Sequence, residues 1–451
     1  MVIVRGGGLY LPPGDERIPG LRNLLRVRNA AHARHVSGQA RGTIPQYAEA
    51  PPEWAYATRA IPAGHKWAGG LIVPRNAPVD VRPTVDRSSD GDPIPARLLP
   101  KLRPYQAEAL AAWGDADDGT IIAPCGAGKT TLGLAAIAAT GRRALILVHT
   151  KDLARQWEDR VAEQLAIPGR VGRVWDGQNS DGQIVIATIQ TLIRWPWAAL
   201  YAWGKRFGLV IMDEAHHAPA ETFSAVLGAL PARRRLGLTA TPGREDGLGD
   251  FTFWHMGPKC YEVDQAALVR AGAVLLPSLQ LVPTHWQPVD PGASWAAQIT
   301  ELTQDGRRNE ILIAAARAEL AEGRQVLVLS DRVGHCRKLA TELGGESITG
   351  KLSARARAAI LGRARAGLVR LVAATSLADE GLDLPGLDTV ILATPTKALG
   401  KLQQRIGRVM RPAPGKARPR VIDLRDGWGP LLGQARRRDR LYRELGISQL
   451  A

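Results

Sequence analysis

The chain has 451 residues, of which 45% are hydrophobic and 23% are charged. This composition is typical of a globular protein and excludes collagen-like, mucin-like and wholly disordered chains. At about 150 residues per domain, the length indicates two or three domains. Lysine and arginine number 59 against 43 aspartates and glutamates, so the net charge is +16 and favours a polyanionic partner, with nucleic acid as the first candidate.

Cysteine usage and hydropathy indicate the environment of the protein. Cys125, Cys260 and Cys336 lie far apart in the sequence and form neither a zinc-binding pair nor a disulfide framework. No stretch reaches the ~18 apolar residues that a membrane span needs, and the N-terminus lacks the apolar core of a secretion signal. We therefore expect a cytoplasmic protein of a bacterium or a phage-infected cell, with no membrane partner.

Residues 1–98 are expected to form a small N-terminal accessory domain that is β-rich or α/β. Arginines alternate there with Trp54, Tyr56 and Trp67, a mixture that suits a DNA-binding platform and equally suits a small core. Residues 76–100 are rich in Pro, Asp and Ser and have no hydrophobic period, which indicates a loop or linker before the next domain.

From Leu102 onward, short apolar runs alternate with helical patterns, which predicts parallel sheets buried on both faces. Residues 99–275 form the first such domain, and the pattern restarts in residues 305–430 after a linker at 276–304. Residues 431–451 are expected to form a basic C-terminal helix. The predicted fold class is α/β, with two tandem parallel-sheet domains and the small N-terminal domain.

A phosphate-binding loop follows the apolar run TIIAP in the first α/β domain. The segment Ala123–Thr130 reads APCGAGKT and opens a helical pattern, as a P-loop requires, although Ala123 replaces the first glycine of the consensus. Gly126 and Gly128 allow backbone N–H groups to surround a phosphate, Lys129 reaches the β- and γ-phosphates, and the Thr130 hydroxyl can bind Mg²⁺.

Two carboxylates follow another apolar run, FGLVIM. Asp213 and Glu214 stand where a P-loop ATPase needs a second Mg²⁺ partner and a group that polarises the attacking water. The pair by itself is common at solvated strand ends. Together with the P-loop it predicts nucleotide hydrolysis, with ATP and Mg²⁺ bound.

Several segments between residues 102 and 426 resemble, in the right order, the motifs of the superfamily 2 helicases, whose motor consists of two RecA-like domains. The resembling segments are LRPYQ before the P-loop, VHTKDLARQW (motif Ia), TIQTL (motif Ic), LTATPGRED (motif III), LVLSDR (motif IV), ATSLADEGLDLP (motif V) and QQRIGRVMRP (motif VI).

This resemblance implies roles for further residues. It implies nucleotide contacts for Arg103, Gln106 and Asp383, and catalytic roles for Gln404, Arg408 and Arg411 in motif VI, where Arg408 and Arg411 share a helix face and act as arginine fingers. It implies nucleic-acid contact, or coupling of hydrolysis to movement, for Thr150, Thr188, His216, Thr239, Thr241, Ser330, Thr375 and Gly381.

Finer features resemble the xeroderma pigmentosum group B helicases, the phage UvsW-type helicases and the type III restriction-like ATPases, which mostly act on duplex DNA. These features are Asp213-Glu-Ala-His-His217 and the triplet Arg244, Glu245 and Asp246, which the resemblance places in a DNA-separating element. Glu380 stands where many DEAD-box RNA helicases carry arginine, and this difference disfavours an RNA substrate.

The C-terminal residues 401–451 contain 13 basic and 4 acidic residues, a net charge of +9. Apolar residues at helical spacing oppose a row of arginines in residues 434–445, so this helix either follows the phosphates of DNA or packs on the second motor domain.

The sequence therefore predicts an ATP-dependent DNA helicase or translocase that moves on or remodels duplex or forked DNA in repair, recombination or phage-type replication. We expect a monomer, with any nuclease, replication or repair partner unidentified. Two alternatives remain open: an RNA helicase, and a DNA-binding scaffold that keeps the fold without unwinding.

Overall fold

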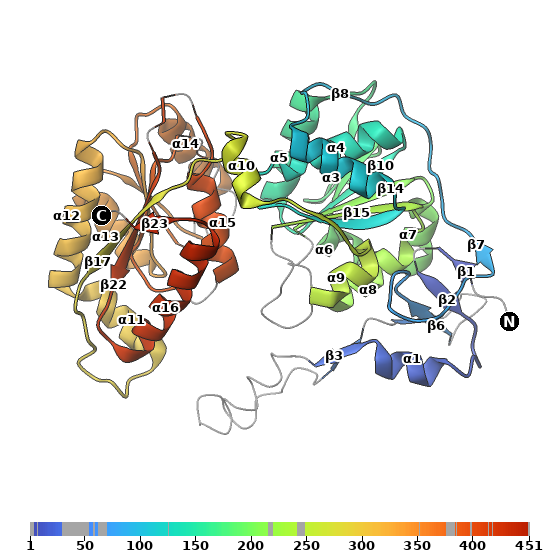
Figure 1. Ribbon diagram of the computed structural model, residues 1–451, viewed down its shortest axis with the longest axis horizontal. Helices are drawn as coiled ribbons and strands as arrows, with labels where there is room; N and C mark the ends of the chain where they lie inside the picture. The colour runs from blue at the N-terminus through green and yellow to red at the C-terminus, as the bar shows by residue number, and fades with distance from the viewer. Residues whose placement is uncertain are drawn as a thin grey trace. The chain divides into compact units, whose positions relative to one another are not determined.

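Figure 1 shows a computed structural model of the protein. The structure describes residues 4–6, 8–28, 54–56, 59–61, 70–124, 126–214, 220–240, 249–350, 352–375, 384, 386–396, 399–413, 415–416 and 418–449. The chain divides into two compact units. Unit 1 comprises residues 1–124 and 128–263, and unit 2 comprises residues 125–127 and 264–451.

Unit 1 is built on a seven-stranded sheet with the order β12-β13-β10-β14-β15-β9-β16, in which every neighbouring pair is parallel. Its strands are β9 (Asp118–Ile122), β10 (Ala144–Val148), β12 (Val171–Val174), β13 (Ile184–Thr188), β14 (Leu209–Asp213), β15 (Arg234–Thr239) and β16 (Lys259–Glu262). All five residues of β9, β10, β13 and β14 are buried, because helices cover both faces of the sheet.

The helices of unit 1 lie in two layers (Figure 1): α3, α4 and α5 cover one face of the sheet, and α7, α8 and α9 lie on the other. The helices are α3 (Pro104–Gly114), α4 (Lys129–Thr140), α5 (Lys151–Gln164), α6 (Ile189–Leu192), α7 (Trp197–Gly204), α8 (Ala220–Ala229) and α9 (Gly249–Met256). A two-stranded sheet joins β8 (Arg97–Leu98) to β11 (Leu165–Ala166). The alternation of strands and helices predicted from the sequence is confirmed.

The N-terminal residues pack on unit 1 as a small β-rich layer. The elements there are β1 (Val4–Arg5), β2 (Leu9–Leu11), α1 (Ile18–Leu24), β3 (Arg26–Arg28), β4 (Trp54–Tyr56), β5 (Arg59–Ala60), β6 (Leu71–Val73) and β7 (Val85–Asp86). A five-stranded sheet has the order β5-β6-β2-β1-β7, and β3 pairs with β4. The apolar core of this layer includes Phe251 of α9, so the described part of residues 1–98 shares a core with the first α/β domain.

A buried ion pair connects the N-terminal layer to the central sheet. Arg75 donates both Nε (2.5 Å) and Nη2 to the carboxylate of Asp118, the first residue of β9. The same guanidinium donates to the carbonyl oxygens of Ala232 (2.7 Å) and Arg233 (2.8 Å). Both charged side chains are almost fully buried, so each charge depends on the other for compensation.

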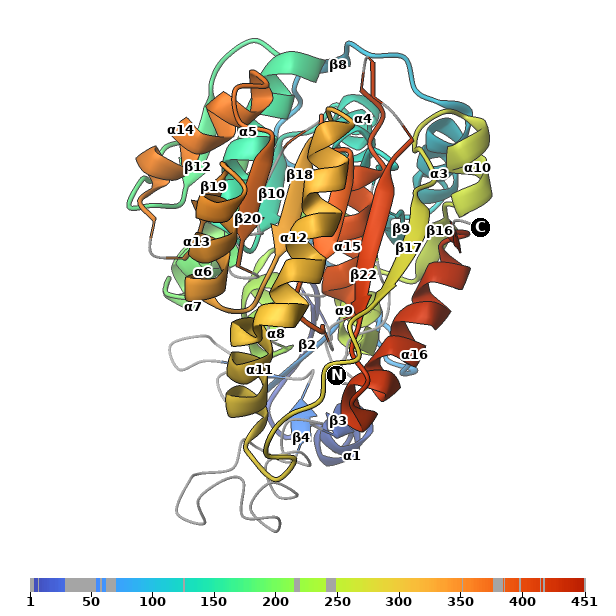
Figure 2. The same cartoon turned by 90° about the vertical axis from the view of Figure 1, so that its left-hand side faces the viewer.

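Unit 2 repeats the design with a second parallel sheet of seven strands, ordered β19-β20-β18-β21-β22-β17-β23, which is seen face-on in Figure 2. Its strands are β17 (Ser278–Pro283), β18 (Val326–Leu329), β19 (Glu346–Ile348), β20 (Leu371–Ala374), β21 (Thr389–Leu392), β22 (Arg420–Arg425) and β23 (Ser448–Gln449). The two parallel sheets confirm the predicted α/β class with tandem RecA-like domains.

The helices of unit 2 also lie on both faces of its sheet, with α12 and α13 on one face and α15 and α16 on the other (Figure 1). The helices are α10 (Gln265–Arg270), α11 (Trp295–Gln304), α12 (Gly306–Ala321), α13 (Val333–Glu342), α14 (Ala354–Arg365), α15 (Leu399–Val409) and α16 (Gly429–Glu444). In the part of the chain that the structure describes, no helix is both long and apolar enough to cross a membrane.

Two segments differ from their expected form. Residues 276–304, expected as a linker, contribute β17 to the second sheet, where it pairs with β22 and β23, and they also form α11. The prolines and tryptophans around SLQLVP obscure its strand pattern in the sequence. The C-terminal helix ends at Glu444, and β23 then joins the sheet. Arg438 of the C-terminal helix is buried and donates from Nε (2.8 Å) and Nη2 (3.0 Å) to the Asp423 carboxylate of β22. This arginine therefore packs the helix against the sheet.

We predict that Asp118→Ala lowers the free energy of unfolding of unit 1 by about 3–5 kcal/mol, because it leaves the Arg75 guanidinium buried without its carboxylate. Asp117→Ala is the matched control, since Asp117 is half exposed and its ion pairs with Arg5 and Arg234 are 3.9 Å long; we expect a change of less than about 1 kcal/mol. Urea unfolding followed by tryptophan fluorescence measures both, and equal effects would contradict the prediction.

A buried histidine predicts a pH dependence for unit 2. His335 donates from Nε2 to Oδ1 of Asn309 (2.9 Å) and accepts at Nδ1 from the Ser330 hydroxyl (2.9 Å). Burial, with the nearby Arg308, lowers its pKa to about 4. In the unfolded chain His335 takes up a proton near pH 6.5, whereas in the folded chain its ring stays neutral down to about pH 4. The free energy of unfolding therefore falls by about 1 kcal/mol for each unit by which the pH is lowered between about 6.5 and 4.

NMR of the imidazole nitrogens tests this pH dependence directly. We expect the His335 ring to remain neutral at pH 5 in the folded protein, and we expect His335→Gln to flatten the fall in unfolding free energy between pH 7 and pH 5. A His335 ring that titrates near pH 6.5 in the folded state would contradict the prediction.

Candidate nucleotide site

The P-loop lies between β9 and α4, at the carboxyl edge of the unit 1 sheet. Gly126 and Gly128 both adopt positive φ, 87° and 78°, a backbone form that glycine accepts without strain. Gly128 is the residue before α4, whose first residues are Lys129 and Thr130. The N-terminus of this twelve-residue helix therefore faces the loop, as anion binding requires.

The neighbouring strand ends bring the predicted acidic pair to the same edge. β14 ends at Asp213, and β15, which lies between β14 and β9, ends at Thr239. Lys129 Nζ lies 3.0 Å from Glu214 Oε1, and both side chains are largely buried. The structure thus brings Lys129, Asp213 and Glu214 together, as the sequence predicted for a hydrolytic site.

Asp213 is a carboxylate withdrawn from water, with 5% of its surface exposed. Its Oδ2 accepts a hydrogen bond from Trp157 Nε1 (2.8 Å), and its Oδ1 accepts one from the backbone N–H of Glu214 (3.0 Å). Burial first, and then the adjacent Glu214 carboxylate, raise the pKa of Asp213 to about 6, against the opposing charge of Lys129. A cation bound beside Asp213 would favour the ionised carboxylate and so lower its pKa.

Trp157 is a functional candidate that sequence reasoning missed. It lies in α5 as the last residue of the segment resembling motif Ia, and is 1% exposed. A Cβ on Gly133 of α4 would lie 2.6 Å from its ring, so the glycine lets the indole pass beneath the P-loop helix to Asp213. The apolar spacing of α5 indicates that Trp157 is buried, but no sequence signal identifies a hydrogen-bond partner 56 positions away.

Gln106 lies beside the P-loop on α3. It is 4% exposed, and its Oε1 accepts a hydrogen bond from the backbone N–H of Arg103 (3.0 Å). A Cβ on Gly128 would lie 2.5 Å from Gln106 Nε2, so the amide and the loop are in close approach. Arg103 in turn donates to the Tyr105 hydroxyl at 3.2 Å. These contacts place Gln106 against the phosphate loop, and the backbone N–H of Arg103 holds the Gln106 amide there.

The predicted nucleic-acid contacts within the described residues lie at, or just after, the ends of strands. Thr150 caps α5 by accepting from the Leu153 N–H at 3.2 Å, and Thr188 ends β13. In unit 2, Ser330 follows β18 and Thr375 follows β20, and both are buried. In parallel sheets, all of these positions lie at the carboxyl edge, where loops carry binding residues.

In unit 2, α15 carries the predicted Arg408 in its last turn, whereas Arg411 lies two residues beyond the end of the helix. The shared helix face expected from the sequence is therefore wrong, because the helix ends at Val409. Lys416, which sequence reasoning also missed, donates from Nζ to the carbonyl oxygens of Val409 (2.8 Å) and Arg411 (2.7 Å). Burial lowers the pKa of Lys416 to about 8. The lysine thereby fixes the end of the helix on which both arginines depend.

Several predicted residues lie outside the described residues: His216, Thr241, Arg244, Glu245, Asp246, Gly381 and Asp383, together with the side chain of Gln404. Their roles stay predictions.

Comparison with known proteins gives two family matches. The model for the res subunit of type III restriction enzymes matches residues 99–244, and the model for the conserved C-terminal helicase domain matches residues 307–413. The two matches cover the segments that carry the P-loop, the acidic pair and motif VI.

Two curated relatives carry the names of DNA helicases. The chain is 29% identical over 336 residues to the putative DNA 3′-5′ helicase Rad25 of Halobacterium salinarum, covering 71% of this chain and 54% of that protein. It is 30% identical over 339 residues to the DNA 3′-5′ helicase XPB of Kineococcus radiotolerans, covering 72% and 60%. The chain thus spans just over half the length of these relatives.

Among solved structures, the helicase Lhr of Mycobacterium smegmatis bound to single-stranded DNA and AMP-PNP matches with a TM-score of 0.52 and 20% identity, over 78% of this chain and 49% of that one. This likeness concerns the fold. The family models and the curated relatives confirm the resemblance inferred from the motifs: the chain belongs to the superfamily 2 helicases, and its sequence is similar to the XPB and Rad25 proteins.

Proposed function

We propose that the chain is an ATP-dependent DNA helicase or translocase that acts on duplex or forked DNA. The observation that carries the proposal is the cluster of Lys129, Asp213 and Glu214 at the carboxyl edge of unit 1, behind a P-loop with both glycines at positive φ. A lysine, a desolvated carboxylate and a second carboxylate are the groups that hydrolysis of a nucleoside triphosphate needs.

The Lys129–Glu214 pair suggests how nucleotide binding prepares hydrolysis. In the structure, the ammonium and the carboxylate neutralise each other at 3.0 Å. A bound triphosphate offers Lys129 a more highly charged partner, and the lysine then leaves Glu214. The released carboxylate is free to orient and deprotonate the attacking water. Gln106, which lies against Gly128, would read the adenine edge with its amide.

The residues present fit a Mg²⁺ ion bound together with the nucleotide. In the described part of the chain, no group of three or more His, Cys, Asp or Glu side chains could hold a metal by itself. Mg²⁺ commonly uses one or two protein oxygens together with substrate phosphates, and Asp213 and Thr130 supply such oxygens. When bound, the ion would neutralise charge on the β- and γ-phosphates. Trp157 would hold the Asp213 carboxylate in its orientation.

Arg408 and Arg411 would act as arginine fingers that stabilise charge on the transferred phosphate. Arg408 lies in the last turn of α15 and Arg411 two residues beyond it, and Lys416 donates to the carbonyl oxygens of Val409 and Arg411. Movement on DNA would follow from the change between nucleotide-bound and nucleotide-free arrangements of the two domains.

DNA is favoured as the substrate because both relatives described above are named DNA 3′-5′ helicases, and because the net charge of +16 favours a polyanion. The test is steady-state ATP hydrolysis with single-stranded DNA, duplex DNA, forked DNA and RNA of matched length, at two salt concentrations. Stimulation by forked or duplex DNA supports the proposal. Stimulation by RNA alone would replace DNA as the substrate class, and no hydrolysis would indicate a scaffold.

We predict that Lys129→Ala lowers DNA-stimulated kcat by at least about 100-fold, because the γ-phosphate loses its cation. Glu214→Gln should lower kcat to a similar degree while nucleotide binding persists, because the amide cannot take a proton. Lys205→Ala is the control, since Lys205 is exposed and lies over the Tyr201 ring; its kcat should equal that of the unchanged protein. Fluorescent-nucleotide binding separates the two site variants.

A separate prediction concerns Trp157. Trp157→Phe keeps an aromatic ring beneath α4 but removes the hydrogen bond to Asp213, so the Mg²⁺ concentration for half-maximal ATPase activity should rise about tenfold. Trp113→Phe is the matched control, because Trp113 is also 1% exposed and donates its Nε1 to the carbonyl oxygen of Arg235 at 2.9 Å. An unchanged Mg²⁺ requirement in Trp157→Phe would show that this bond does not position the carboxylate.

A further inference from the structure

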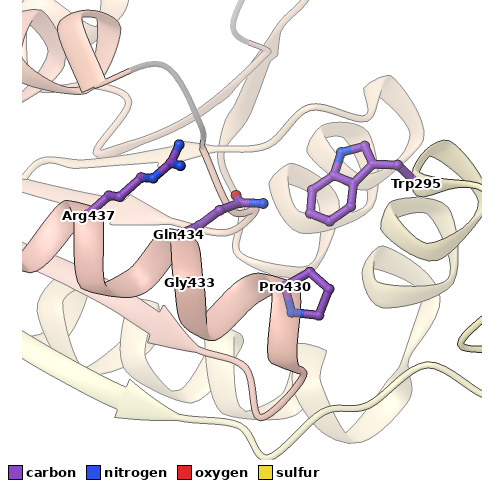
Figure 3. Close-up of a pocket in the computed structure, with 5 residues that line it drawn as sticks. All are labelled: Trp295, Pro430, Gly433, Gln434 and Arg437. Carbon is purple, nitrogen blue, oxygen red and sulfur yellow. The ribbon is translucent and has the colours of Figure 1, made fainter. Parts of the chain in front are cut away.

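A pocket of about 370 Å³ lies in unit 2 between α11 and the N-terminal half of α16 (Figure 3). Its lining residues are Trp295, Pro430, Gly433, Gln434 and Arg437. None of them belongs to the helicase motifs, so the nucleotide site described above does not account for the pocket. Its volume is at the lower end of the roughly 300–1,000 Å³ that small-molecule sites occupy, which suits a ligand group no larger than one nucleotide.

The pocket lies beyond the carboxyl edge of the unit 2 sheet. α11 begins after the end of β17, and α16 begins after the end of β22. Ser330 and Thr375, the predicted nucleic-acid contacts of this unit, follow β18 and β20 in the same parallel sheet. The pocket is therefore on the side of the sheet where a nucleic-acid strand is expected.

A direct connection joins α11 to the loop that carries Ser330. Arg332, two residues after Ser330, donates from Nη2 to the carbonyl oxygen of Ala296 (2.8 Å) and from Nε to the Thr300 hydroxyl (3.1 Å). Both acceptors lie in α11, within five residues of Trp295. The wall of the pocket is thus held in fixed relation to a predicted strand contact.

The lining combines three chemical functions. Trp295 contributes an aromatic ring, Arg437 an exposed guanidinium, and Gln434 an amide that points into the pocket beside Trp295 (Figure 3). Gln434 is 7% exposed, and its Oε1 is a buried acceptor with no hydrogen-bond partner among the described residues. Such an acceptor costs free energy until a donor reaches it, so the site is completed by a ligand that carries one.

A nucleotide of a single strand matches these functions. Bases stack on aromatic side chains whatever their sequence, and an amide both donates to and accepts from a base edge. Arg436, Arg437, Arg440 and Arg443 are all exposed on α16, a charge pattern that suits a phosphate backbone. An apolar peptide would gain nothing from these charges.

We propose that this pocket binds one unstacked base of the nucleic-acid strand on which the protein acts. The base lies against Trp295, its edge meets the Gln434 amide, and the adjoining phosphate meets Arg437. This inference rests on the proposed function and adds to it a strand contact outside the helicase motifs.

Gly433 provides a test that leaves the charges in place. It is an exposed helical glycine, and a Cβ there would meet no atom within 4 Å, so Gly433→Leu fills the pocket and improves helix propensity. Gly362→Leu on α14 is the matched control, because Gly362 is also exposed with open space and lines no part of the pocket. Arg437→Ala and its neighbour Arg436→Ala form a second matched pair.

Binding of the full chain to oligodeoxythymidylate, followed by fluorescence anisotropy, is the measurement. We expect Gly433→Leu to weaken binding about tenfold, the loss of one stacked base, and Gly362→Leu to leave it unchanged. Arg437→Ala should weaken binding more than Arg436→Ala does. A strand of abasic residues should bind Gly433→Leu and the unchanged protein equally, because it has no base to insert.

Further results separate this inference from the proposed function. ATP hydrolysis without nucleic acid should be the same in all four variants, because none of these residues belongs to the nucleotide site. If DNA stimulates hydrolysis while Gly433→Leu binds oligodeoxythymidylate as well as Gly362→Leu does, the pocket does not hold a base and only this inference fails. If the unchanged protein neither binds strands nor responds to them, the proposed function fails as well.

An acidic peptide that binds the pocket while strand affinity stays unchanged would assign the pocket to a protein partner.

Discussion

The architecture of unit 1 depends on keeping one carboxylate, Asp213, out of water at the end of a fully buried strand. A parallel sheet covered on both faces ends its strands at one edge, and there the backbone and side chains of different elements meet. Burial makes the charge of Asp213 costly, as its raised pKa of about 6 records. Hydrogen bonds from Trp157 and from the Glu214 N–H, together with the positive charge of Lys129, offset part of that cost. The same set of contacts holds the groups that nucleotide chemistry requires.

Unit 2 meets a comparable constraint with a different solution. Asp426, just beyond β22, accepts from Arg308 Nε (2.6 Å) and Nη2 (3.1 Å) and from the Thr284 hydroxyl (2.6 Å). Arg308 also donates to the carbonyl oxygen of Ala393 at 2.8 Å. This buried cluster joins α12 to the ends of β17, β21 and β22. The carboxyl edge of unit 2 is therefore held by a satisfied ion pair, which leaves the loops above it available for binding.

The sequence predicted the parts of the site that are local in the chain. The P-loop and the acidic pair each consist of adjacent residues after a strand, so their spacing reveals them. Trp157 and Asp213 are 56 positions apart, and Arg75 and Asp118 are 43 apart, so their pairing follows only from the packing of α5 and of the N-terminal layer. β17 was not predicted because its short apolar run lies among prolines and tryptophans. The pocket around Gln434 requires two helices that no pattern in the sequence places side by side.

The shared core between the N-terminal layer and α9 has a consequence for how unit 1 can be divided. The restriction-type family match begins at residue 99, yet Leu9, Leu11, Leu71 and Val73 pack with Phe251 and Trp254. In addition, the Tyr10 hydroxyl donates to the carbonyl oxygen of Gly228 at 2.9 Å. A polypeptide shortened to the family boundary would expose this apolar surface and become prone to aggregation. The smallest independently folding form of unit 1 therefore extends upstream of the residues that carry its sequence motifs.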